Sequence, residues 1–392
     1  MKILVICQYY SPEPFKVADV CEALVKKGHE VDVVTSFPNY PMGEIYEGYE
    51  NCAHKEENIN GVNVHRVFTI GRKSGFLFRL LNYYAFSVSS SLFVRKLKKD
   101  YDVVFVYQLS PVLMARAGVS YKKKHNKKLL LYCLDLWPDS LTLGGIKKGS
   151  LIYNYFKKKS EKIYNSADRI LVSSKMFEQY FCEMFRICGQ KIDYLPQYAE
   201  DVFVPHSHKE GAVTNITFAG NIGTTQSIET ILYAAKKLEN ENILFNIYGD
   251  GSGLVAFKDM AENHLKLKNL VFHGRISLDE VARKYAESDG LIVTLSDNPV
   301  LSMSFPGKIQ TYMAAGKPII GAVNGEASEI IKEADCGFCA NAEDVDGLVD
   351  CIKQFMVSDK ISLGKNARRY YEENFRKEDF INSLSKELEN LR

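Results

Sequence analysis

The chain has 392 residues, of which 46% are hydrophobic and 25% charged, so its composition excludes a disordered or fibrous protein and its length favours two domains. The net charge of +2 conceals an uneven distribution: residues 1–200 carry 29 Lys and Arg against 20 Asp and Glu, whereas residues 201–392 carry 21 against 28. A basic first half predicts an anionic partner, either nucleic acid or a phospholipid surface.

Short apolar runs predict buried parallel strands in two series. The first series comprises residues 3–7, 31–34, 103–106, 129–132 and 169–172, with a helical pattern at 17–27. After a loop-like stretch at 196–214, the second comprises 215–218, 244–248, 270–272, 290–293 and 318–321. This order predicts an α/β fold of two tandem Rossmann-like, doubly wound domains, residues 1–200 and 201–375, with an interdomain cleft. A polar helix at 376–392 is expected to pack back across the hinge.

The nine cysteines are scattered and lie mostly in apolar stretches, which predicts free thiols in a cytoplasmic protein. Cys336 and Cys339 have the spacing of a redox pair but do not open a helix, so we expect no redox role for them. The histidines form no metal-binding pair, and because an apolar strand is predicted at residues 3–7, we expect no leader segment.

The segment from Pro306 to Pro318 predicts an anion site. Pro306 and Gly307 form a turn, and the helix expected at 309–315 ends at Gly316. Lys308 then stands where free amides and the helix dipole already favour an anion, such as the diphosphate of a nucleotide. The alternative is an ordinary helix with an exposed lysine in its first turn.

Turns after other predicted strands supply further candidates. Gly220-Asn221-Ile222-Gly223 has a backbone that could approach a phosphate, or it is simply a tight turn. Gly249 belongs to a loop resembling a dinucleotide fingerprint with its third glycine misplaced, and is expected to line the cleft. Asp135 and Trp137 follow a predicted strand and offer a carboxylate and an aromatic face to a ligand in the cleft, or else they are a capping aspartate and a core tryptophan. The loop after the first strand adds Glu13 and Lys16 as further cleft candidates.

Residues 76–94 form a run rich in Phe, Leu and Tyr, but Arg79, Asn82 and four serines make it too polar to span a membrane. It lies among clusters of Lys and Arg, and it predicts either a helix in the membrane interface or a buried helix surrounded by solvated lysines. The basic clusters lack interleaved aromatic residues, which argues against nucleic acid.

The ordered motifs resemble the family-4 retaining glycosyltransferases of GT-B fold, especially the WbuB-like bacterial enzymes of capsule and O-antigen synthesis. The resemblance covers nearly the whole chain. It rests on residues 12–14, 27–31, 37–41, 46–49, 135–140, 218–223, 248–251, 272–274 and 306–318.

The chain departs from that family at several positions, and four of these lie on the donor side. Relatives carry two glutamates where this chain has Met303 and Thr311, and a basic pair where it has Asn221 and Gln226. The contacts those glutamates make to the donor cannot be carried over. With both basic positions neutral, Lys308 becomes the principal candidate for balancing the diphosphate charge.

The resemblance implies transfer of a sugar from a nucleotide sugar, expected to be a UDP-sugar, to a lipid-linked saccharide. Transfer would proceed with retention and without a metal or other cofactor, at the inner face of the membrane. An anionic membrane surface is an expected partner. Alternatives are a UDP-sugar 2-epimerase and a non-catalytic relative that binds a nucleotide sugar. The expected catalytic residues are Lys308 and Asp135; donor residues are Gly220, Asn221, Gly223, Gly249, Arg275, Pro306, Gly307, Thr311 and Glu329; acceptor residues are Glu13, Lys16 and Trp137.

Overall fold

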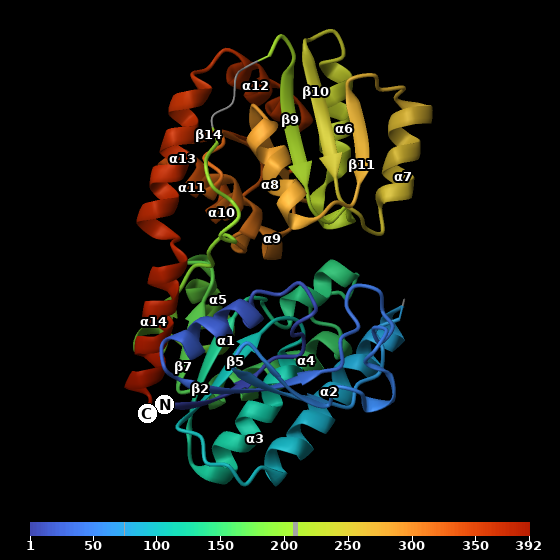
Figure 1. Ribbon diagram of the computed structural model, residues 1–392. Coiled ribbons are helices and arrows are strands. Elements are labelled where there is room, and N and C mark those ends of the chain that lie inside the picture. The colour runs from blue at the N-terminus through green and yellow to red at the C-terminus, as the bar shows by residue number, and fades with distance from the viewer. Residues whose placement is uncertain (74, 207–210) are drawn as a thin grey trace. The chain divides into compact units, whose positions relative to one another are not determined.

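The computed structural model describes residues 1–73, 75–206 and 211–392, and the chain divides into two compact units. Unit 1 comprises Met1–Leu195 and Ile381–Arg392, and unit 2 comprises Pro196–Phe380. Each unit holds one sheet with helices on both faces (Figure 1). The architecture is the α/β fold of two Rossmann-like domains that the sequence predicts.

The sheet of unit 1 has eight strands in the order β3-β4-β2-β1-β5-β6-β7-β8. All neighbouring strands are parallel except β3 and β4. The apolar runs predict five of these strands and miss the edge strands β3 and β8 and the neighbouring β4, because apolar and polar residues are mixed in β3 and β4 and β8 has only three residues. The strands are β1 (Lys2–Ile6), β2 (Glu30–Ser36), β3 (Glu56–Ile59), β4 (Val62–Val67), β5 (Val103–Gln108), β6 (Lys128–Cys133), β7 (Arg169–Val172) and β8 (Ile192–Tyr194).

The helices of unit 1 include the last helix of the sequence, α14 (Lys377–Asn390), from Ile381 onward. There the His29 ring lies 2.8 Å from the Ser385 hydroxyl, and Arg169 donates to Glu387 at 3.1 Å. Residues from both ends of the sequence therefore build the same unit. The other helices are α1 (Val17–Lys26), α2 (Phe76–Lys96), α3 (Arg116–His125), α4 (Leu151–Ser166) and α5 (Met176–Phe185).

The sheet of unit 2 has six parallel strands in the order β11-β10-β9-β12-β13-β14. The strands are β9 (Thr214–Ala219), β10 (Ile243–Tyr248), β11 (Leu270–Gly274), β12 (Gly290–Thr294), β13 (Ile319–Ala322) and β14 (Gly337–Ala340). The apolar side chains of α6 (Ile228–Lys237) and α12 (Val345–Met356) form one core layer. The second layer holds α8 (Leu278–Glu287), α10 (Gly307–Ala314), α11 (Glu326–Glu333) and α13 (Lys360–Asn374), and the remaining helices are α7 (Leu254–Asp259) and α9 (Pro299–Met303).

The order in which successive strands are added to the sheet reverses beside a central strand in each unit. In unit 1, β1 pairs with β2 on one side and β5 on the other, and in unit 2, β9 pairs with β10 and β12. Open α/β sheets bind ligands at the carboxyl ends of strands beside such a reversal. The turns after β9 and β10 therefore lie where a ligand is expected in unit 2.

Two of the cysteines correct the expectation that all nine are free thiols. Cys182 and Cys188 form a disulfide. Helix α5 ends at Phe185, and Arg186 takes a left-handed conformation with φ of 57°, so the chain turns back and brings Cys188 beside the helix. The other seven cysteines are free.

Within residues 1–73, 75–206 and 211–392, no helix is both long enough and apolar enough to cross a membrane.

Candidate functional site

Two glycine turns at the carboxyl edge of the unit 2 sheet pack backbone against backbone. The Gly220 N–H donates to the Tyr248 carbonyl at 3.0 Å. A Cβ atom on Gly249 would lie only 1.8 Å from the Gly220 oxygen, and Gly249 has φ of 140°, which disfavours other residues. Both positions therefore require glycine, and the turns after β9 and β10 form one rigid surface.

The turn after β9 leaves two amides for a ligand. Ile222 N–H donates to Asp250 at 2.8 Å, so it and the Gly220 amide are used within the protein. The amides of Asn221 and Gly223 donate to no acceptor in the described parts of the chain. The Asn221 side chain instead donates to the side chain of Gln226 at 2.9 Å, so the two neutral residues that replace the family's basic pair contact each other.

Lys308 lies directly against this turn. Its helix, α10, begins at Gly307 after Pro306, as the sequence predicts to within two residues. A Cβ atom on Gly220 would lie 2.4 Å from Lys308 Cε, so the glycine makes room for the lysine. The ammonium Nζ is 3.9 Å from the centre of the Phe218 ring, a cation–π contact.

The Lys308 ammonium lacks a carboxylate partner among the described residues. Burial lowers its pKa to about 7, because loss of water disfavours the charged form. An anion placed beside Nζ would restore the protonated form. The first-turn amides of Gly307 and Lys308 also donate to no protein acceptor in the described residues, so the start of α10 offers two further donors to an anion.

A cavity of about 220 Å³ in unit 2 adjoins Lys308. Thr311 lines it, and its hydroxyl donates to the Gly307 carbonyl at 3.0 Å. Glu200 also lines this cavity, yet no sequence motif marks it, because it stands in the loop-like stretch before β9. The remaining lining residues are Phe203, Ala219, Gly220, Leu278, Val281 and Tyr285.

Two other donor-side candidates stand apart from this cavity. Arg275 is exposed just after β11, and its turn is joined to Gly249, whose N–H donates to Gly274 at 2.8 Å. Glu329 is exposed in α11, which begins at Glu326. Glu326 is only 2% exposed, so the buried carboxylate at the start of this helix is three residues earlier than the sequence suggests.

In unit 1, Asp135 follows β6, and burial raises the pKa of its carboxyl group, although hydrogen bonds from Ser110 oppose the shift. Trp137 is only 3% exposed: its indole N–H donates to the Ser110 hydroxyl at 2.9 Å, and its ring packs edge-on against Tyr83 and Phe156. The prediction of an open tryptophan face for a sugar is therefore wrong, because aromatic neighbours on two helices cover the ring.

Arg72 occupies the same edge of unit 1, although sequence reasoning counted it with the surface basic clusters. Its guanidinium lies 5.5 Å from the ring centre of Tyr40 and 5.9 Å from that of Tyr83. Its Nε is buried and has no hydrogen-bond partner. Its positive charge also acts on Asp135. Only the folded chain brings this arginine to the edge, since a loop carries it there.

Glu13 and Lys16 differ in their exposure. The Glu13 carboxylate accepts N–H groups from Asn39 at 2.9 Å, Tyr40 at 2.7 Å and Tyr10 at 3.2 Å. Burial raises the pKa of Glu13 to about 7 despite these donors. Glu13 thus holds the loop after β2, while Lys16 is partly exposed at the start of α1.

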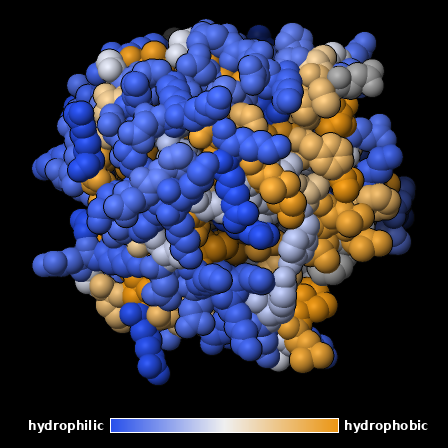
Figure 2. Space-filling model, turned by 90° about the horizontal axis from the view of Figure 1, so that it is seen from below, coloured by the Kyte–Doolittle hydropathy of each residue, from blue (hydrophilic) through white to orange (hydrophobic). Residues whose placement is uncertain are grey.

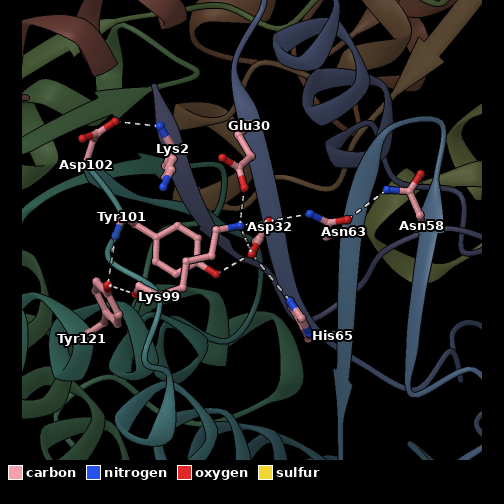
Figure 3. Close-up of polar contacts among 10 residues, drawn as sticks. All are labelled: Lys2, Glu30, Asp32, Asn58, Asn63, His65, Lys99, Tyr101, Asp102 and Tyr121. Atoms are coloured by element: carbon pink, nitrogen blue, oxygen red, sulfur yellow. Dashed lines mark hydrogen bonds and ion pairs between the residues drawn. The ribbon is translucent and has the colours of Figure 1, made fainter.

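Figure 3 shows a network of polar contacts centred on Asp32, in β2. One lysine of the basic first half, Lys99, is paired within this network and so does not add to a basic surface. Lys99 lies 2.8 Å from Asp32 and 2.6 Å from Glu30, and the Tyr101 hydroxyl donates to Asp32 at 2.5 Å. Burial alone would raise the pKa of Asp32, but contacts from His65, Lys99 and Tyr101 outweigh it and hold this pKa well below its usual range. Lys99 is therefore a structural residue.

An Asp-x-Asp tripeptide at residues 344–346 has the spacing of some metal sites, but both carboxylates are engaged. Asp344 accepts the Gly347 N–H at 2.9 Å and caps α12, and Asp346 pairs with Lys237. Residues 1–73, 75–206 and 211–392 contain no group of three or more His, Cys, Asp and Glu arranged to hold a metal ion.

Comparisons with known proteins find glycosyltransferase families for both units. The model of Glycosyltransferase Family 4 matches residues 17–197, and that of Glycosyl transferases group 1 matches residues 201–378. WbjE of Pseudomonas aeruginosa, named as a glycosyltransferase, is 29% identical over 265 residues, which cover 63% of this chain and 64% of WbjE. The match therefore spans less than two thirds of that relative.

Two further proteins match over their whole length. WcaI of Escherichia coli (strain K12), named as a glycosyl transferase of colanic acid biosynthesis, is 25% identical over 413 residues, covering 98% of this chain and 100% of WcaI. The crystal structure of Anabaena Alr3699/HepE in complex with UDP-glucose has a TM-score of 0.71 at 13% identity and covers all of both chains. At that identity the likeness shows a shared fold.

Proposed function

We propose that this chain, which belongs to the glycosyltransferases of GT-B fold through its family 4 and group 1 domains, transfers a sugar from a UDP-sugar to a lipid-linked saccharide during the synthesis of a surface polysaccharide. The donor class is supported by HepE, which was solved with UDP-glucose, and the pathway by WcaI, which is named for colanic acid biosynthesis. We further propose retention at the sugar carbon and a peripheral position on the inner face of the membrane.

The proposal that the donor is a UDP-sugar rests on the surroundings and the pKa of Lys308. Its ammonium lies against Gly220, faces a ring rather than a carboxylate, and has a pKa lowered to about 7. A protein that buries a lysine in this way without an anion of its own has a site prepared for an anionic ligand. The diphosphate of a UDP-sugar supplies that charge.

Sugar transfer makes the diphosphate more negative as its bond to the sugar breaks. A fixed ammonium and helix amides stabilise this growing charge without a metal ion, because they are already oriented before the reaction. Removal of one such contact typically slows catalysis by about 100- to 1,000-fold. We therefore assign Lys308 to the leaving group, with Pro306 and Gly307 placing the first turn of α10.

The acceptor is assigned to the edge of unit 1 that carries Asp135 and Arg72. A carboxyl group whose pKa burial has raised is suited to accept a proton from a sugar hydroxyl. The unpartnered Nε of Arg72 offers a donor for an acceptor oxygen in the same region. Trp137 then acts as a support behind Asp135, not as a sugar platform.

The decisive experiment incubates the purified protein with a panel of UDP-sugars and a lipid-linked saccharide, and identifies products by mass spectrometry. Transferred sugar with its anomeric configuration retained is expected. An epimerised UDP-sugar without transfer, or no chemistry with tight UDP-sugar binding, would contradict the proposal.

Variants then test the role of Lys308. Lys308→Ala should lower the transfer rate by about 100- to 1,000-fold while the thermal unfolding midpoint changes little. Lys353→Ala, which removes an exposed lysine from α12, is the matched control and should transfer normally. Equal rates for both variants would remove Lys308 from the leaving-group role.

A further inference from the structure

Helix α2 has its polar residues inside and many of its apolar residues outside. Asn82 and Ser90 are fully buried, and Ser87 and Ser91 nearly so. The hydroxyls of Ser90 and Ser91 donate to carbonyls of the same helix, and Asn82 donates to the Ile70 carbonyl at 2.6 Å. Three of the polar residues that argued against a membrane span, Asn82, Ser90 and Ser91, thus bond within the protein, whereas Arg79 is exposed.

The outer side of α2 carries an apolar stripe. Leu77, Leu81, Val88 and Leu92 follow at intervals of four, seven and four residues, so they lie on one side of the helix. Leu77 is 64% exposed and Leu92 53%. A monomer in water rarely shows so many large apolar side chains on one helix, so this side is expected to meet an apolar partner.

The stripe continues onto α4. The Tyr84 and Tyr155 hydroxyls are 2.8 Å apart and join the two helices, and Leu151 at the start of α4 is 90% exposed. Figure 2 shows the molecule from below. Hydrophobic surface gathers along the right-hand side of this view, which is the side on which α2 lies in Figure 1. We call this surface the α2–α4 face; its exposed apolar residues are Leu77, Phe78, Leu81, Val88, Leu92, Leu151, Ile152 and Tyr155.

The charges near this face are almost all positive. Residues 68–97 contain five Lys or Arg and no Asp or Glu, and residues 147–162 contain six against one. Arg95 and Lys96 end the α2 stripe, and Lys158 and Lys162 continue the exposed side of α4; all four are exposed. Each basic residue near an anionic lipid surface strengthens binding about fivefold.

We propose that the α2–α4 face docks on an anionic lipid bilayer, with its apolar side chains in the headgroup region and its lysines and arginines on the lipid phosphates. Charge selects this partner over a second copy of the chain. Two copies joined through the same face would place basic residues against basic residues, whereas an anionic bilayer pairs with them.

This inference rests on the proposed function, because docking on a bilayer would bring the enzyme to a lipid-linked acceptor held in that bilayer. Trp137 packs against Tyr83 of α2 and Phe156 of α4, and Asp135 precedes it by two residues. The docking helices are therefore connected through one buried ring to the edge that carries the proposed acceptor carboxylate.

Flotation with vesicles tests the face. The full-length protein should bind vesicles of phosphatidylcholine with 30% phosphatidylglycerol at low salt, and bind phosphatidylcholine alone at least about tenfold more weakly. The variant Leu77→Glu with Leu151→Glu should lose at least about tenfold in binding. The control Val255→Glu with Val357→Glu changes two exposed apolar residues of unit 2 and should bind within about twofold of wild type. Equal loss in both variants, or no binding by wild type, overturns the proposal.

A fluorescence measurement locates the contact. Trp137 is the single tryptophan and is buried, so a second tryptophan reports its own surroundings. Brominated lipids should quench Leu151→Trp but not Val255→Trp, and the reverse pattern refutes the assignment. A dimer that the two glutamates dissociate, without vesicle binding, would instead identify a second copy as partner.

Transfer to a short-chain, water-soluble acceptor separates the two proposals. Docking variants should keep this activity within about twofold, because the substituted side chains are exposed on the surface of unit 1 and are not part of the catalytic machinery. Vesicle binding without any transfer would refute the proposed function alone, whereas transfer without vesicle binding would refute the docking face alone.

Discussion

The titration of Lys308 predicts how donor binding depends on pH. The pKa of this ammonium is lowered to about 7 in the free protein, whereas a bound diphosphate would raise it. Only the protonated lysine offers the charge that the diphosphate requires. Affinity for a UDP-sugar should therefore be greatest below pH 7 and fall as the pH rises through 7.

The size of the effect follows from the protonated fraction. With a pKa of about 7, roughly nine tenths of the lysine is protonated at pH 6 and roughly one tenth at pH 8. Because the apparent dissociation constant varies inversely with the competent fraction, it should rise about tenfold between pH 6 and pH 8. A UDP-sugar is the proper ligand, since its diphosphate has no terminal phosphate that titrates near neutral pH.

Isothermal titration calorimetry at half-unit intervals of pH measures this constant, and repeating it in buffers of different ionisation enthalpy counts the protons taken up. Lys308→Arg is the matched control, because a guanidinium stays charged throughout and its binding should be flat from pH 6 to 8. A flat wild-type profile, or an equal slope in the arginine variant, would refute a titrating Lys308 as the diphosphate partner.

Three other perturbations test separate parts of the structure. Asp32→Asn should lower the free energy of unfolding by about 3 kcal/mol at pH 7. The pKa of Asp32 is depressed in the folded state, so this difference should shrink as the pH falls below about 4. Denaturant titrations at several pH values measure it. Gly249→Ala should abolish UDP-sugar binding in calorimetry, because its Cβ meets a backbone oxygen, whereas Gly211→Ala, whose nearest contact is 3.8 Å away, should bind normally. Arg72→Gln should raise the acceptor KM about tenfold in steady-state kinetics and leave UDP-sugar affinity unchanged; a changed donor affinity would contradict its acceptor role.

The sequence predicted the sheets well where burial is uniform. Strands such as β1 and β5 lie inside the sheet and are apolar on both faces, so their composition alone marks them. The hairpin of β3 and β4 was missed because it is half exposed at an edge. Its charged residues, such as Glu57, which pairs with the buried Arg66, resemble a loop in the sequence.

The candidate site was predicted in part, because motifs fix local backbone but not distant contacts. Gly220 and Lys308, which the sequence marks separately by a turn and a helix start, lie in contact, while their binding of a donor stays a prediction. Glu200 and Arg72 were missed because each reaches its site from a loop without a motif. Trp137 was misjudged, since only the packing of α2 and α4 around it decides whether its ring is covered.

The return of α14 to unit 1 has a consequence for how the protein is made. The contacts of Ser385 with His29 and of Glu387 with Arg169 join the first unit to residues that the ribosome adds only after the whole of unit 2. At 5–20 residues per second, this interval lasts roughly 10 to 40 seconds. During synthesis, unit 1 therefore lacks its last helix until unit 2 has been made. A fragment that stops at Leu195 should be cleaved by proteases faster than the same residues in the full chain.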